Sequence, residues 1–515
     1  MERFAIKELE KWKNKSNRKP MVLMGARQVG KTWLMKTFGE KNYKKVAYIS
    51  FYNNQAMKDI FETDYDVKRI IPYLNIEVGF SITPNDTLII FDEIQNAPKA
   101  FESLKYFCED APEYHIIVAG SLLGVALHQG VSYPVGKVDI LNLHPLSFRE
   151  FLYALDEQPL ADALITKDYN LINAFSEKYI YHLKNYYYVG GMPEVVDYFR
   201  QNKDYNEVRN LQKAILTQYK GDFGKHVESN EIPKINLVWD SIPMQLAKEN
   251  KKFFFGKIKE GARSNEFENA IQWLTDSGLV HKVNRVNEPK IPLSAYKNFS
   301  IYKLFVLDIG LLCAMSELDS QTILKGNELF VEFKGALAEQ YVLQQIICDT
   351  NYTPYYFGTD KSTFEQDFII QKENDVVPIE VKSSTNVRSQ SLKAFYEKSG
   401  YMNNTPADLF ERYLKTGMGG EPMIVDYEKS MIDFAISSPD AFNQVNDDIR
   451  VLYPTPTIWN SHCFTVFTEN GSKLHEAIND PEISQIAWEK YGFRTGITGG
   501  RYDVSALGIG IPQSI

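Results

Sequence analysis

Residues 20–32 read PMVLMGARQVGKT, an apolar run that leads into the pattern G-x-x-x-x-G-K-T. The next residues, TWLMKTFG at 32–39, have the apolar spacing of a helix, so this loop joins a strand to a helix. Gly25 and Gly30 let the chain wrap around phosphate groups with its amides pointing inward. In such a loop the Lys31 ammonium reaches the β- and γ-phosphates, and the Thr32 hydroxyl binds Mg²⁺. The structural alternative is a glycine-containing turn before a helix.

The loop and the first turn of its helix supply the predicted contacts to a nucleotide, and the expected ligands are ATP and Mg²⁺. Lys31 is also a predicted catalytic residue, because it reaches the phosphate that is transferred. The predicted binding residues are Gly25, Ala26, Arg27, Gln28, Val29, Gly30, Lys31, Thr32 and Trp33.

A second motif, TLIIFDEIQ at 87–95, is an apolar β run that ends in two acids, with Asp92 61 residues after Lys31. This is the pattern of a Walker B strand. Asp92, at the carboxyl end of the strand, would hold Mg²⁺ through water, while Glu93 would polarise the water that attacks the γ-phosphate. The alternative is that the two acids only solvate the end of a strand.

The next β run, EYHIIVAGSLLG at 113–124, ends at Ser121. A polar side chain between the Walker B strand and the γ-phosphate would sense the bound nucleotide. The alternative role for this hydroxyl is to cap the helix that follows.

Several motifs occur together in one order: GARQVGKT, FDEIQ, AGSLLG, SYPVGKV, LHPLSFREFL and, at 190–196, GGMPEVV. In this respect residues 1–200 resemble a group of bacterial and archaeal AAA-type ATPases. The resemblance implies an α/β P-loop NTPase core with a parallel sheet of ASCE-type strand order, and it raises the expectation of a homo-oligomer. It also implies an arginine finger, for which Arg27, Arg149 and Arg200 are equal candidates.

Residues 201–328 are predicted to form a helical and winged-helix segment. Phe267, Ile271 and Leu274 make one apolar stripe, Gly278 ends that helix, and residues 280–286 and 299–308 have the pattern of a β-hairpin. Basic residues interleaved with aromatic ones precede the helix: Lys251, Lys252, Lys257, Lys259 and Arg263 with Phe253, Phe254 and Phe255. In a DNA-binding protein they would neutralise phosphates, and the alternative is a solvated basic face over an aromatic core. IPLSAYK and YKLFVLDIGLL resemble a domain of uncharacterised function that follows the ATPase in the same group.

In residues 329–399, four charged residues occur in an order that is typical of a metal-dependent catalytic site. Glu339 lies on a helix-like stretch, Asp367 on a short β run, and Glu380 and Lys382 on the next run as E-x-K. This order resembles a truncated PD-(D/E)xK nuclease-like α/β domain. The resemblance implies a second Mg²⁺ or Mn²⁺ held by the acids, with Lys382 stabilising the developing charge. A binding platform without cleavage, or a surface ion pair beside an unrelated Asp367, is the alternative.

Residues 400–515 form an acidic α/β tail of different composition. Residues 401–515 hold 8 basic and 15 acidic residues, a net charge of −7 of the chain's −9. Residues 1–400 therefore carry a net charge of only −2. The overall acidity of the chain thus does not exclude DNA binding by this part. The tail resembles the carboxyl-terminal lobe of bacterial extracellular solute-binding proteins. A genuine fusion, a recombined gene and a chance likeness all remain open, as does a small-molecule cleft at Tyr453, Trp459, His462 and Phe464.

Composition and spacing limit the function classes further. At 44% hydrophobic and 24% charged, the chain is neither a disordered nor a collagen-like protein. Cys108, Cys313, Cys348 and Cys463 lie far apart, which predicts free thiols and no structural zinc. The sequence shows no secretory signal and no apolar run long enough to cross a bilayer. We therefore expect a cytoplasmic protein that does not bind a membrane. The expected activity is ATP hydrolysis coupled to DNA handling, against a nucleotide-gated regulatory module or a solute-sensing fusion.

Overall fold

The computed structural model describes residues 2–127, 134–225, 227–248, 252–325, 331–358 and 365–383, with a few isolated positions from residue 391 onward. Contacts divide the chain into two units, Met1–Leu392 and Lys393–Ile515. Nearly all described residues belong to the first unit, to which the rest of this description applies. The predicted cleft at Tyr453, Trp459, His462 and Phe464 lies outside the described residues, as does almost all of the predicted tail.

The first sheet consists of five parallel strands in the order β2-β3-β4-β1-β5. Because β4 lies between β1 and β3, the two Walker strands are separated by one strand, which is the ASCE-type order that the resemblance implied. The parallel P-loop NTPase core is therefore confirmed. The strands are β1 (Met21–Met24), β2 (Lys45–Ser50), β3 (Thr87–Asp92), β4 (His115–Ala119) and β5 (Asp139–Asn142).

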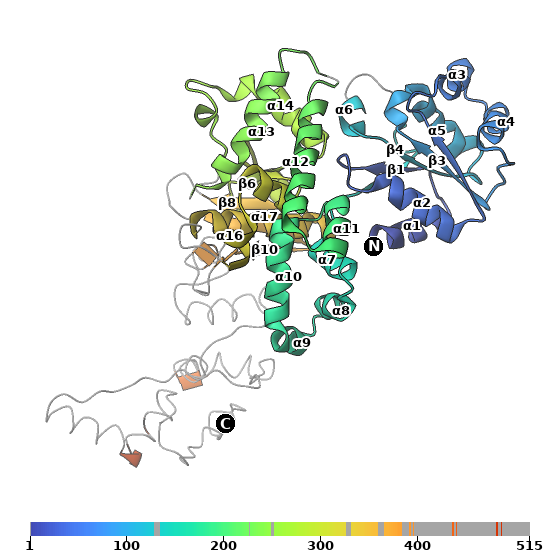
Figure 1. The fold of residues 1–515 in the computed structure, drawn as a ribbon. Helices are drawn as coiled ribbons and strands as arrows, with labels where there is room; N and C mark the ends of the chain where they lie inside the picture. Colours follow the sequence, from blue (N-terminus) through green and yellow to red (C-terminus); the bar gives the residue numbers. More distant parts are fainter. Residues whose placement is uncertain are drawn as a thin grey trace. The chain divides into compact units, whose positions relative to one another are not determined.

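Helices cover both faces of this sheet (Figure 1). Successive side chains of a strand point to opposite faces, so Leu23 packs in one hydrophobic cluster and Val22 in the other. The Leu23 cluster includes α1 (Ala5–Lys13) and α2 (Lys31–Asn42), and the Val22 cluster includes α3 (Gln55–Thr63), α4 (Val67–Val78) and α5 (Pro98–Asp110). Double coverage explains why the strands are apolar runs rather than alternating patterns.

A helical region follows the parallel sheet. Ser147 begins α7 with a capping box, in which its side chain accepts a hydrogen bond from the Glu150 amide and the Glu150 carboxylate accepts one from the Ser147 amide. The buried Glu150 also forms an ion pair with Arg3 at 3.1 Å, which ties the N-terminus to this region. The helices of this region are α7 (Phe148–Ala154), α8 (Gln158–Thr166), α9 (Tyr169–Ala174), α10 (Ser176–Val189), α11 (Pro193–Asn202), α12 (Tyr205–Asp222) and α13 (Ile232–Leu246), while the short α6 (Leu123–Leu127) lies between β4 and β5.

The second sheet is mixed, with five strands in the order β10-β9-β8-β6-β7. β6 and β8 are parallel and the other neighbours are antiparallel. The strands are β6 (Val280–Val286), β7 (Lys297–Val306), β8 (Tyr355–Gly358), β9 (Glu365–Lys372) and β10 (Asp375–Ile379). The accompanying helices are α14 (Glu268–Asp276), α15 (Ile309–Met315), α16 (Ser320–Lys325) and α17 (Val331–Asp349).

The expected winged helix differs from the structure. A helix and a hairpin do form, as α14 and β6–β7, but β6 also pairs in parallel with β8 through Arg285 and Val286. The hairpin is thus part of a larger sheet rather than a free wing. The expected boundary at 328/329 separates β6 and β7 from the other three strands in the sequence, although the pairing of β6 with β8 joins all five in one sheet.

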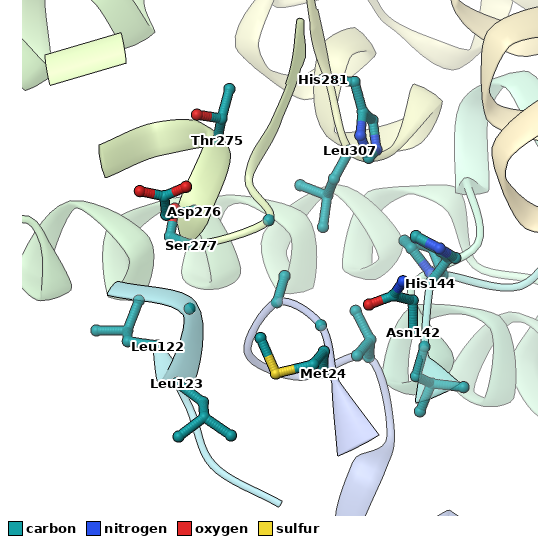
Figure 2. A pocket seen from close by; sticks show the side chains of 17 residues that line it. Met24, Leu122, Leu123, Asn142, His144, Thr275, Asp276, Ser277, His281 and Leu307 are labelled. Atoms are coloured by element: carbon teal, nitrogen blue, oxygen red, sulfur yellow. The ribbon is translucent and has the colours of Figure 1, made fainter. Parts of the chain in front are cut away.

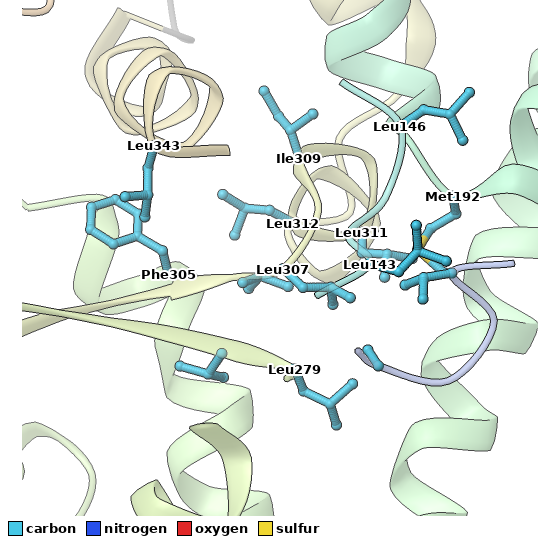
Figure 3. Packing of buried hydrophobic residues seen from close by; sticks show 14 of the residues in the cluster. Leu143, Leu146, Met192, Leu279, Phe305, Leu307, Ile309, Leu311, Leu312 and Leu343 are labelled. Atoms are coloured by element: carbon cyan, nitrogen blue, oxygen red, sulfur yellow. The ribbon is translucent and has the colours of Figure 1, made fainter. Parts of the chain in front are cut away.

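The segment between β7 and α15 packs against the parallel-sheet part of the same unit (Figure 3). Leu307 and Leu311 lie beside Leu143, Leu146 and Met192 in one buried cluster. This shared core fixes the mixed sheet next to the loops at the carboxyl edge of the parallel sheet. Among the described residues, no helix has the length and apolarity needed to cross a membrane.

Candidate nucleotide-binding site

The glycine-rich loop links β1 to α2 and uses several left-handed backbone conformations. Gly25 has φ 139°, Gln28 66° and Gly30 94°. A Cβ on Gly25 would lie 2.2 Å from the Leu143 carbonyl oxygen, so no larger residue fits without moving backbone. The loop therefore has the shape that its sequence predicts for wrapping a phosphate group.

Lys31 lies inside this loop and is buried. Its ammonium donates to the carbonyl oxygens of Gly25 at 2.8 Å and Ala26 at 2.7 Å. Burial lowers the pKa of Lys31 to about 8, although the nearby carboxylates of Glu93 and Asp92 act to raise it. A polyphosphate would offer this buried cation the negative charge that the two carbonyls lack.

Thr32 and Asp92, the two predicted Mg²⁺ ligands, are in direct contact. The Thr32 hydroxyl donates to Asp92 Oδ2 at 2.8 Å, and the Tyr48 hydroxyl donates to the same oxygen at 2.9 Å. A hydroxyl and a carboxylate at the end of a P-loop are oxygen ligands of the kind that Mg²⁺ prefers. The residues present thus fit the ATP and Mg²⁺ that an AAA domain implies.

Glu93 lies one residue beyond Asp92 in a left-handed conformation, with φ 54°. Its carboxylate accepts hydrogen bonds from the Ser121 hydroxyl, 3.0 Å from each oxygen, and from Gln95 at 2.5 Å. Ser121, predicted as a nucleotide sensor, therefore holds the predicted water-activating acid. A non-glycine residue in this region is uncommon and is typical of functional sites.

The other predicted residues divide into buried and accessible ones. Ala26 and Val29 are buried, whereas Trp33 is 42% exposed at the first turn of α2. Among the arginine-finger candidates, Arg149 pairs with Asp349 at 3.0 Å and Arg200 with Asp197 at 3.2 Å.

Arg27 turns towards α12 instead. Its Nη1 donates to both oxygens of Asp222 at 3.0 and 2.9 Å. The Tyr219 hydroxyl donates to the Arg27 carbonyl oxygen at 2.8 Å, and Gln28 donates to Gln218 at 2.9 Å. Contacts from Gln218, Tyr219 and Asp222, all near the carboxyl end of α12, thus join the phosphate loop to one helix. The sequence motifs gave no signal for them, nor for Tyr48.

A cavity of about 260 Å³ opens beside the loop (Figure 2). One side is formed by Met24, Leu122 and Asn142 of the parallel-sheet part, and the other by residues 275–278 at the carboxyl end of α14. A Cβ on Gly278 would come within 3.2 Å of the Ala26 amide nitrogen, so this turn lies directly against the phosphate loop.

The acids of the nuclease-like order surround a lysine. Lys303 of β7 is fully buried, with its ammonium 2.5 Å from Glu365 and 3.4 Å from Glu339 of α17. Burial would lower the pKa of Lys303, but these carboxylates and that of Asp367 hold it above its ordinary value. Burial and Glu339 raise the pKa of Asp367 to about 7, against the opposing effect of Lys303.

Glu380 and Lys382 lie just beyond β10 and pair with each other at 2.6 Å. Glu380 also accepts a hydrogen bond from Gln366 at 3.0 Å, while the Val381 amide donates to Asp367 at 2.7 Å. The described part of the chain contains no cluster of three or more His, Cys, Asp or Glu side chains that would hold a metal ion. The structure therefore brings Glu339 and Asp367 around a lysine cation.

The basic and aromatic residues before α14 separate into core and surface. Phe253 is buried and stacks on Tyr302 at 6.2 Å, and Phe255 packs against Phe267 at 6.1 Å. Phe254 is 38% exposed. Lys257, Lys259 and Arg263 are exposed and form no ion pair with any residue that the structure describes, whereas Lys251 lies outside the described residues.

Three family models match the chain in succession. Residues 17–152 match an AAA domain, residues 180–322 a domain of unknown function (DUF8612), and residues 334–414 another domain of unknown function (DUF4143). The chain therefore carries an AAA-type P-loop ATPase domain followed by two domains of unknown function. None of the curated proteins matches it.

Solved structures resemble the chain only distantly. The Walker-type ATPase of Pyrococcus abyssi is 13% identical over 60% of this chain and 94% of that one, with a TM-score of 0.38. The ORC1 protein of Aeropyrum pernix in complex with DNA is 15% identical over 61% and 90%, with a TM-score of 0.25. The Drosophila ORC bound to DNA is 13% identical over 63% and 95%, with a TM-score of 0.21. At these values the likeness carries no information on function.

Proposed function

We propose that this protein is a Mg²⁺-dependent ATPase whose hydrolysis is coupled to nucleic-acid binding. The observation that carries the ATPase part is the arrangement at the ends of β3 and β4. There Asp92 contacts Thr32 at 2.8 Å, while the next residue, Glu93, is held separately by Ser121. This difference in surroundings supports a metal-binding role for Asp92 and a water-activating role for Glu93. The AAA-domain match over residues 17–152 supports the same activity.

Each side chain then has a distinct task. Lys31 would exchange its two carbonyl partners for the phosphates, and the loop amides would bind the same group. Bound Mg²⁺ supplies positive charge to the phosphate oxygens, and Thr32 and Asp92 would hold it. Glu93 would accept a proton from the attacking water, with its carboxylate oriented by Ser121 and Gln95. The resulting products are ADP and inorganic phosphate.

The test is to replace the proposed base without disturbing the metal site. Glu93→Gln should retain ATP and lose turnover by about 100-fold or more, because one oriented catalytic group is removed. Lys31→Ala should abolish nucleotide binding instead. Binding is measured with a fluorescent ATP analogue, and turnover by phosphate release. Unchanged hydrolysis in Glu93→Gln would overturn the assignment of the base.

Coupling to nucleic acid is supported by the surface before α14. Lys257, Lys259 and Arg263 are exposed and follow Phe254, whose ring is accessible, within ten residues of the sequence, which suits contact with phosphates and a base. Replacing these three cations by glutamine should weaken DNA binding and reduce its salt dependence. Fluorescence anisotropy at several salt concentrations, with and without ATP, measures both. DNA affinity equal to that of the unmodified chain would contradict this part of the proposal.

For residues 331–383 we propose a PD-(D/E)xK-like fold that binds rather than cleaves. Support for the fold comes from the order α17, β8, β9, β10, with Asp367 on β9 and Glu380 just beyond β10. Support for the absence of cleavage comes from Lys303, whose ammonium already neutralises Glu339 and Glu365. Incubation with linear DNA and Mn²⁺ should leave the DNA intact. Cleavage that is lost in Asp367→Ala would instead support the predicted nuclease metal site.

The nucleotide-gated regulatory module is the second candidate function, and the contacts of α12 with the phosphate loop favour it. In that case ATP binding would change assembly without a need for turnover. Light scattering measures whether ATP causes oligomerisation. Oligomerisation that persists in Glu93→Gln would distinguish the regulatory module from an enzyme that depends on ATP turnover.

A further inference from the structure

We propose that Arg27 contacts the γ-phosphate of the nucleotide bound in its own loop, and that Asp222 of α12 positions it there. The inference deepens the proposed ATP hydrolysis and rests on it. It makes Arg27 the catalytic cation and Asp222 a positioning residue supplied by the domain of unknown function that matches residues 180–322.

The first support is the location of Arg27 in the loop. Arg27 directly follows Ala26, whose carbonyl oxygen accepts a hydrogen bond from Lys31 at 2.7 Å, and in loops of this kind the lysine ammonium reaches the β- and γ-phosphates. Arg27 thus lies at the end of the site where charge changes during hydrolysis. Arg149 of α7 and Arg200 of α11, the other two candidates, lie outside this loop, where they pair with Asp349 and Asp197.

The second support is the way in which Asp222 holds the guanidinium. Both hydrogen bonds to Asp222 come from Nη1 alone. Nε and Nη2 make no hydrogen bond to any residue that the structure describes, and the Arg27 side chain is 41% exposed. The arginine is therefore anchored at one nitrogen while its other donors are available to an oxyanion.

The third support is the rigidity of the anchor. The Asp222 side chain is only 6% exposed and also accepts a hydrogen bond from Lys225 at 2.5 Å. The Tyr219 hydroxyl fixes the Arg27 carbonyl from the preceding turn of α12. Because the guanidinium is already fixed in position, it needs little reorganisation when negative charge develops on the transferred phosphate. For the same reason, movement of α12 would change the rate of hydrolysis.

The experiment measures kcat, KM and ADP affinity of the full chain. Arg27→Ala should lower kcat by about 100-fold, the loss expected for one preorganised donor, while ADP affinity stays unchanged. Asp222→Asn should lower kcat by a smaller factor without changing KM. In the Arg27→Ala background, Asp222→Asn should have no further effect on kcat, since the group that it positions is gone.

Gln218→Ala is the matched control. It removes a neighbouring contact between α12 and the loop, the exposed bond from Gln28, without touching Arg27, so kcat should not change. Because Arg27 acts within its own chain, the specific activity should also be independent of protein concentration.

Three results would overturn the inference in a chain that hydrolyses ATP. They are an unchanged kcat in Arg27→Ala, an Asp222→Asn effect that persists in the double variant, and an equal loss of kcat in Gln218→Ala. Absence of hydrolysis in the unmodified chain would refute the proposed function itself, so the two failures are distinguishable.

Discussion

Asp308 shows how one buried carboxylate can hold separate parts of the chain together. It is fully buried, and it accepts hydrogen bonds from the Gly191 amide at 2.6 Å, the Leu311 amide at 3.0 Å and Gln344 at 3.1 Å. Burial raises its pKa above the ordinary range, and these donors act in the opposite direction. The residue thus links the sequence GGMPEVV to α15 and α17.

Asp308→Ala should lower the free energy of unfolding by about 3 kcal/mol or more, because three buried donors lose their acceptor. Asp308→Asn keeps one acceptor oxygen and should cost less. Urea denaturation of both variants measures the difference. A loss in Asp308→Ala below about 1 kcal/mol, the range of ordinary surface changes, would show that water replaces the carboxylate.

At this scale the sequence predicts which residues meet when the signal is local. The motifs at 25–32 and 87–95 predict that Thr32 and Asp92 share one site, and their side-chain oxygens are 2.8 Å apart. Asp222 is 195 residues from Arg27, and no spacing rule covers that distance. Lys303 was missed for the same reason, since its partners come from a helix and a strand that follow it in the chain.

At the scale of the element, α14 ends against the phosphate loop. Gly278 adopts φ +75° at this end, and its Cα lies close to the Ala26 amide nitrogen. The predicted helix and its terminating glycine are both present, yet the sequence did not indicate what the turn touches. The hairpin after it was likewise predicted, but its pairing with β8 depends on residues further along the chain.

Gly278→Ala should therefore weaken ATP binding as well as stability. The left-handed conformation costs about 1–2 kcal/mol for a residue with a Cβ, and the added methyl would press on the loop. Gly261→Ala is the matched control, with φ +76° and open space around its position. Both variants should lose similar stability in urea, while only Gly278→Ala loses ATP affinity. Equal ATP affinities in the two variants would contradict the contact.

At the scale of the whole described unit, buried histidines make stability depend on pH. Burial is the main cause that lowers the pKa of His115 to about 4, of His144 to about 4 and of His281 to about 3. In the unfolded chain each would have a pKa of about 6.5. Between these values the unfolded state binds more protons than the folded state, so stability falls as the pH is lowered from neutral.

We expect the urea midpoint at pH 5 to lie well below that at pH 7. His281→Gln, which cannot be protonated, should reduce this difference, because one of the protons taken up on unfolding is removed. The midpoints of both proteins at the two pH values test this. A difference that is as large in His281→Gln as in the unmodified chain would show that His281 does not contribute.

The mixed sheet has a consequence for how such genes are inherited. Its five strands are drawn from two stretches, residues 280–306 and 355–379, which match two separately defined families. Parallel pairing of β6 with β8 joins the two halves, so either stretch alone would leave an unpaired strand edge open to solvent and prone to aggregation. Selection should therefore transmit the two stretches as a pair.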